Sequence, residues 1–90
     1  MSFVHAREHL HAGDVVIVNC THQCNVCVME DSDFQSFRNG GSHNYHGGFF
    51  QRLPARVRVP HTGYWNVTVD LGNSQSAFRY GISYLKSRAA

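Results

Sequence analysis

The chain has 90 residues, which is enough for one small domain, and we expect residues 1–90 to form a single unit. A hydrophobic fraction of 42% and a charged fraction of 16% are typical of a globular protein and exclude a disordered one. The net charge of +2 is too small to predict nucleic-acid binding, and the absence of a long apolar run argues against a membrane span or signal peptide. A cytoplasmic protein is the expectation.

The N-terminal part predicts strands separated by one short helix. Residues 3–5 suit a short strand, and Ala6 to Ala12 suit about two helical turns ended by Gly13. Residues 15–20 form an apolar run without alternation, as in a strand that is covered on both faces. Residues 25–29 read as the returning strand.

The middle of the chain predicts a second helix and a glycine corner. Ser32, followed three residues later by Gln35, is a capping-box pattern, which predicts a helix over residues 33–38. Residues 42–46 resume as a strand. Gly47 and Gly48 then predict a bulge or a tight corner.

The C-terminal half has the strongest β pattern. Residues 55–59 alternate valine with arginine, and residues 64–71 alternate an apolar stripe led by Trp65 with polar side chains. A Pro-Gly turn between them predicts a hairpin, and residues 72–74 predict a turn before a last alternating strand over 77–84. The sequence therefore predicts an all-β fold: a small antiparallel β-sandwich or partly open barrel of about seven strands with one short helix.

Cysteines give the most distinct candidate for metal chemistry. Cys20, His22 and Cys24 lie close together in sequence, but zinc prefers four ligands and no second cysteine pair follows. Buried or turn cysteines explain the pattern more simply, because a free thiol packs as a small hydrophobe. A zinc site and a thiol nucleophile stay open as alternatives. We expect no cofactor.

Two histidines next to turns are candidates for ligand binding. His46 precedes the Gly47-Gly48 corner, and His61 lies in the Pro-Gly turn. If their strand ends meet, the imidazoles line a cleft with aromatic neighbours, which suits a small ligand or a metal ion. The candidate ligand-binding residues are His46, Gly47, Gly48, His61, Tyr64 and Asn66. The alternative is that the glycines and His61 only shape the backbone.

Two further patterns have simple structural interpretations. Arg56 and Arg58 share one strand face, where pairing with Asp70 on the next strand explains them, with an anion-binding patch as the alternative. His5 and His9 have the helical spacing of metal ligands if residues 6–12 are a helix. No complete catalytic set is visible, so we predict no catalytic residue.

Four segments together resemble a known family. They are Gly13-Asp14 before a valine-rich strand, Asn19 to Val26, His46-Gly47-Gly48-Phe49-Phe50, and Val59-Pro60-His61-Thr62-Gly63-Tyr64-Trp65-Asn66-Val67. In combination they are similar to an uncharacterised bacterial family of small all-β domains, described as a domain of unknown function. The resemblance implies a domain that stands alone or is attached to Toll/interleukin-receptor-like signalling domains.

The function expected from all of this is a non-catalytic binding or interaction module, in an accessory or sensing role in bacterial signalling. Its expected partner is another protein or a second copy of the chain, because open sandwiches expose edge strands. A small-ligand or metal site at His46 and His61 is the alternative. Nucleic acid and membrane are not expected as partners.

Overall fold

The computed structural model describes residues 3–71 and 79–87. In chain order it contains β1 (Val4–Leu10), β2 (Val15–Cys20), β3 (Cys24–Glu30), α1 (Asp31–Arg38), β4 (His46–Phe50), β5 (Ala55–Arg58), β6 (Gly63–Asp70) and β7 (Tyr80–Leu85). The predicted all-β fold with about seven strands and one short helix is confirmed. Within the described ranges, no helix is long and apolar enough to span a membrane.

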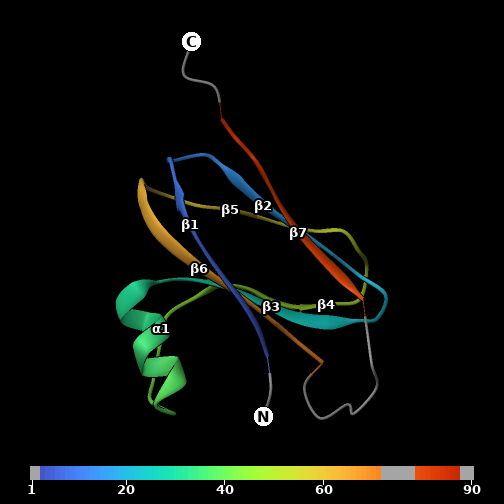
Figure 1. The fold of residues 1–90 in the computed structure, drawn as a ribbon, viewed down its shortest axis with the longest axis horizontal. Helices are drawn as coiled ribbons and strands as arrows, with labels where there is room; N and C mark the ends of the chain where they lie inside the picture. The colour runs from blue at the N-terminus through green and yellow to red at the C-terminus, as the bar shows by residue number, and fades with distance from the viewer. Residues whose placement is uncertain (1–2, 72–78, 88–90) are drawn as a thin grey trace.

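The strands form two antiparallel sheets that pack as layers (Figure 1). The four-stranded sheet has the order β1-β6-β3-β4, and the three-stranded sheet has the order β5-β2-β7. The helix α1 lies against β3 and β6 at one end of the four-stranded sheet. These two layers are the sandwich that the alternating patterns predict.

The core lies between the sheets and consists mainly of valines around Trp65, which is 1% exposed. The strand and helix patterns predict a core of Val16, Ile17, Val18, Val26, Val28, Phe34, Val57, Val59, Trp65, Val67, Val69, Phe78, Tyr80 and Ile82. Most of these side chains are buried, and Ile82 is partly buried against the core. Tyr80 is an exception because it is 49% exposed on β7, and Ile17 is only partly buried because it points away from the core on the outer face of β2. The turn expected over residues 72–74 and the expected core residue Phe78 lie outside the described residues.

The first segment is one strand, so the predicted helix over residues 6–12 is wrong. β1 pairs with β6 from Val4↔Val69 to Leu10↔Gly63. Val4, Ala6, Glu8 and Leu10 alternate along it, and this period suits a strand. His5 and His9 are therefore four strand residues apart, roughly 13 Å, which is too far to share a metal ion.

The predicted hairpin between residues 55–59 and 64–71 is also wrong. β5 pairs with β2, whereas β6 lies in the other sheet between β1 and β3. The chain crosses between sheets after Val59, whose N–H donates to the Asp14 carbonyl and whose carbonyl accepts from Gly13. Alternation shows which side chains share a face, but it does not show which strand lies alongside.

The helix begins two residues earlier than predicted. α1 spans Asp31–Arg38 and its N-cap is Glu30, which makes no side-chain capping hydrogen bond. Ser32 lies inside the helix, so the capping box is absent. Two acidic residues in the first turn, Asp31 and Asp33, favour the N-terminus through the helix dipole.

Gly47 and Gly48 lie inside a regular strand rather than at a bulge. β4 pairs with β3 without interruption from Val28↔His46 to Cys24↔Phe50. Gly47 has φ of +117°, and a Cβ atom there would lie 2.2 Å from the Val26 carbonyl oxygen. Only glycine therefore allows β4 to approach β3 this closely.

Candidate functional site

The candidate site is built around Trp65, near the beginning of β6. Its indole is buried at the α1 end of the core, and Nε1–H donates to the His61 carbonyl oxygen at 3.1 Å. Trp65 pairs with Glu30, the last residue of β3, across the sheet. This pairing places the start of the helix and the turn before β6 around one aromatic ring.

His46 and His61 meet at this ring although 15 residues separate them in the chain. The His61 ring centroid lies 5.0 Å from that of Trp65, and the His46 ring centroid lies 5.8 Å from it. His61 Nε2 also lies 3.4 Å from Glu30 Oε1. Both imidazoles are exposed on their outer sides, so they are accessible to a ligand.

A cavity of about 150 Å³ opens beside Trp65. Its walls are formed by Met29, Glu30, Asp33, Asn44, Tyr45, His46 and Trp65. A larger depression of about 340 Å³ lies by the β2–β3 connection and the start of β7, but it is more open to solvent. The Trp65 cavity combines enclosure with ionisable groups, which is why we treat it as the site.

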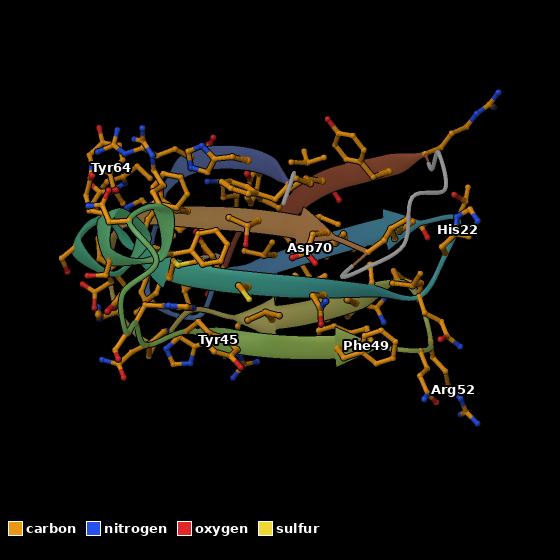
Figure 2. The ribbon with its side chains drawn as sticks, turned by 90° about the horizontal axis from the view of Figure 1, so that it is seen from below. His22, Tyr45, Phe49, Arg52, Tyr64 and Asp70 are labelled. Atoms are coloured by element: carbon orange, nitrogen blue, oxygen red, sulfur yellow. The ribbon has the colours of Figure 1, made fainter. Side chains whose placement is uncertain are left out.

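Of the six predicted ligand-binding residues, His46 lines the cavity, His61 lies beside it in contact with Trp65 and Glu30, and the other four lie elsewhere. Gly47 and Gly48 do not line the cavity, because their conformations serve the pairing of β4 with β3. Tyr64 and Asn66 alternate with Trp65 along β6 and therefore point to the opposite face of the sheet. Figure 2 shows Tyr64 at the α1 end, Phe49 on β4 and Tyr45 just before that strand.

The wall residues Met29, Glu30, Asp33 and Asn44 were not predicted from the sequence. Met29 and Glu30 end β3 and become neighbours of Trp65 through the pairing of β3 with β6, whereas Asp33 lies in the first turn of α1 and Asn44 follows the helix. Asp33 Oδ1 accepts the backbone N–H of Asn44 at 3.0 Å, which holds the segment after the helix against its first turn. Glu30 could have been predicted only from the register of β3 with β6, because this register places it opposite Trp65.

Asn66 serves as an anchor for the helix rather than as an exposed ligand group. Its side chain is 1% exposed, and its Nδ2 donates to Asp31 Oδ1 at 2.7 Å. His5 Nε2 lies 2.8 Å from Asn66 Oδ1, and the His5 ring stacks on Phe34 with centroids 4.0 Å apart. The expectation of an outward Asn66 is wrong because α1 covers this part of the sheet.

Arg7 completes the network on this face. Its guanidinium forms two hydrogen bonds with the Asp31 carboxylate, at 3.0 and 2.8 Å, and lies 3.9 Å from the centroid of the Tyr64 ring. The hydrogen bonds from Arg7 and Asn66 lower the pKa of Asp31 to about 2. The ring of Tyr64 is therefore already in contact with an arginine of the same chain.

Stability is expected to fall in acid through Asp31. Because its pKa is lower in the folded than in the unfolded chain, its contribution is full above about pH 4 and is lost as the pH falls towards 2. The ion pair is half-exposed, so we expect the charge of Asp31 to contribute about 1 kcal/mol to the free energy of unfolding. Urea unfolding of the protein and of Asp31→Asn from pH 7 to pH 2 measures it. The two stabilities should converge in acid, and a constant difference would contradict this assignment.

Cys20, His22 and Cys24 are not gathered into one cluster in the described structure. Cys20 and Cys24 thiols are neighbours, and burial, followed by the proximity of Cys20, raises the pKa of Cys24 to about 12. His22 is exposed, and its Nδ1 lies 3.0 Å from Thr21 Oγ1. Over residues 3–71 and 79–87, no three or more His, Cys, Asp or Glu side chains are grouped to hold a metal ion. A thiol with a raised pKa is a poor nucleophile at neutral pH.

Arg56 and Arg58 do not pair with Asp70, because they lie in different sheets. The two arginines lie on β5 opposite Ile17 and Val15 of β2. Asp70 lies at the end of β6, where its Oδ1 accepts from the Asn25 side chain at 3.1 Å. Neither guanidinium has an ion-pair partner in the part of the chain that the structure describes.

Comparison with known proteins identifies a family model that matches residues 1–87, described as "Domain of unknown function (DUF1883)". The match covers nearly the whole chain and confirms that the resemblance is to a domain of unknown function. Searches of curated proteins and of solved structures found no significant match.

Proposed function

Because the chain belongs to the DUF1883 family, whose function is unknown, we propose from the geometry that it is a non-catalytic recognition module that binds a small chemical group beside Trp65. The observation that carries this proposal is the convergence of His46 and His61 on one buried indole next to a cavity. Aromatic rings beside a few polar groups are typical of sites that bind small molecules.

The geometry favours binding over catalysis and over metal chelation. Trp65 Nε1–H is used by the His61 carbonyl, so the indole serves as a wall and not as a proton donor to substrate. Among the described residues, the partly exposed carboxylate of Glu30 is the ionic neighbour of His61, and no cysteine is among the described lining residues of the cavity. These groups suit a ligand held by contact and by charge.

An accessory role follows from the family resemblance. Attachment to Toll/interleukin-receptor-like domains in bacteria, which the resemblance implies, supports a sensing domain whose bound ligand informs a signalling partner. A site at one end of a small sandwich suits this role, because it leaves the sheet edges available to a neighbour.

The single tryptophan of the chain makes the proposal directly testable. We would titrate the full chain with four probes of different chemistry: methylguanidinium, phosphate, glucose and adenosine. Trp65 fluorescence and ¹H–¹⁵N spectra report binding. At least one probe is expected to give a saturable change centred on Trp65, His46 and His61.

Two histidine variants separate specific binding from general solvent effects. His46→Ala removes an exposed ring in contact with Trp65 and is expected to weaken binding about tenfold. His22→Ala removes an exposed ring at the opposite end of the molecule and should leave binding unchanged (Figure 2). Absence of a saturable change with all four probes, or equal loss in both variants, would refute the proposal.

A further inference from the structure

We propose that the group bound beside Trp65 is an organic cation, namely a guanidinium or an ammonium such as the end of an arginine or lysine side chain. This inference rests on the proposed function and adds the chemical class of its ligand. Three independent properties of the cavity carry it: the charge of its walls, its aromatic surfaces and its size.

The walls of the cavity are negatively charged. Glu30 and Asp33 contribute two carboxylates, and no lysine or arginine is among the lining residues that the structure describes. The nearby N-terminus of α1 offers only about half a positive charge, which is less than the two carboxylates carry. An entering anion would meet repulsion, whereas a cation would gain two favourable interactions.

The nearest guanidinium of the chain does not supply this cation. Arg7 is bound to Asp31 through two hydrogen bonds on the outer face of the four-stranded sheet. Asp31 does not line the cavity, so the carboxylates of this region divide into two sets. Asp31 is neutralised within the chain, while the ionic neighbour of Glu30 over residues 3–71 and 79–87 is His61, at 3.4 Å.

The aromatic surfaces also favour a cation. Trp65 and Tyr45 both line the cavity, and Tyr45 is 49% exposed. Tyr45 supplies the exposed ring, and Trp65, which is only 1% exposed, forms a buried part of the wall. An aromatic ring attracts a cation, and the attraction grows when water is excluded. Carboxylates combined with aromatic faces are the chemistry of alkylammonium and guanidinium recognition.

The size limits the ligand to a small group. A volume of about 150 Å³ corresponds to roughly five water molecules at ~30 Å³ each. This admits the end of a basic side chain but is below the ~300 Å³ at which pockets usually enclose a drug-sized ligand. A nucleoside would therefore remain mostly outside.

Methylguanidinium is the probe that tests this inference. We expect a saturable change in Trp65 fluorescence with a dissociation constant near 1 mM, as is reasonable for so small a ligand. Glu30→Gln and Asp33→Asn each keep the shape of the side chain and should weaken binding about tenfold. The matched control is Asp70→Asn, which removes the same charge at the other end of β6 and should change the dissociation constant less than twofold.

The outcomes separate this inference from the proposed function. Phosphate binding in place of methylguanidinium would overturn the cation inference and leave a recognition site intact. Equal affinity in Glu30→Gln, Asp33→Asn and Asp70→Asn would show that the two wall carboxylates do not select the ligand, which also overturns it. Absence of binding by all probes would refute both.

Discussion

Replacing Trp65 by alanine is expected to lower the free energy of unfolding by about 3–5 kcal/mol, the largest loss that we expect from a single substitution in this protein. The indole is 1% exposed and lies within the continuous core between the sheets. Its removal leaves a cavity and frees the His61 carbonyl that Nε1–H now binds. A domain of this size has roughly 5–13 kcal/mol in total, so the variant would be marginal.

Urea unfolding followed by circular dichroism measures this loss, because the variant has no tryptophan fluorescence. Trp65→Phe is the control that keeps a buried ring and removes only the indole N–H. It is expected to cost less than the alanine variant, and it allows a measurement if the alanine variant does not fold. A loss below about 1 kcal/mol for Trp65→Ala would contradict the central position of this ring.

Replacing Gly47 by alanine is expected to destabilise the protein by about 3 kcal/mol or more. The added Cβ would lie 2.2 Å from the Val26 carbonyl oxygen, closer than real Cβ contacts, and the backbone has φ of +117°. Both problems concern backbone atoms, so no side-chain rotation relieves them. β4 must therefore move away from β3.

Hydrogen exchange locates this effect, since the amides paired between β3 and β4 should lose protection before those between β1 and β6. Gly81→Ala is the matched control within a strand, because nothing lies within 4 Å of its added Cβ and its φ is not in the left-handed region. The control is expected to change stability by less than about 1 kcal/mol. Equal effects of the two substitutions would show that close approach at Gly47 is unimportant.

Loss of the β4 pairing would also alter the candidate site. His46 is the first residue of β4 and reaches Trp65 only because β4 is held next to β3. Gly47 thus acts through the position of its neighbour, although it does not line the cavity. The predicted set of ligand residues therefore contained two kinds of residue: His46 and His61, which contact Trp65, and Gly47, which holds His46 in place.

Local sequence determined which residues form most of the strands and which face of β6 is apolar. Trp65, Val67 and Val69 are buried as their alternation predicts, because a period of two places such side chains on one face. The same reasoning failed for the opposite face, where Asn66 and Thr68 are 1% and 0% exposed. Alternation between apolar and polar residues does not show that a helix or a neighbouring strand will cover the polar face.

The sequence by itself therefore determined the fold class, the presence of the helix that follows β3, and the choice of His46 and His61 as candidate residues, but it wrongly predicted a helix over residues 6–12. Only the tertiary structure decided that β6 lies between β1 and β3, that α1 closes over Asn66, and that Glu30 and Asp33 line the cavity at Trp65. The physical reason is that side-chain periodicity is a local property of the chain. Strand partners are chosen by burial and hydrogen bonding between segments far apart in sequence, and these contacts bring the groups of the site together.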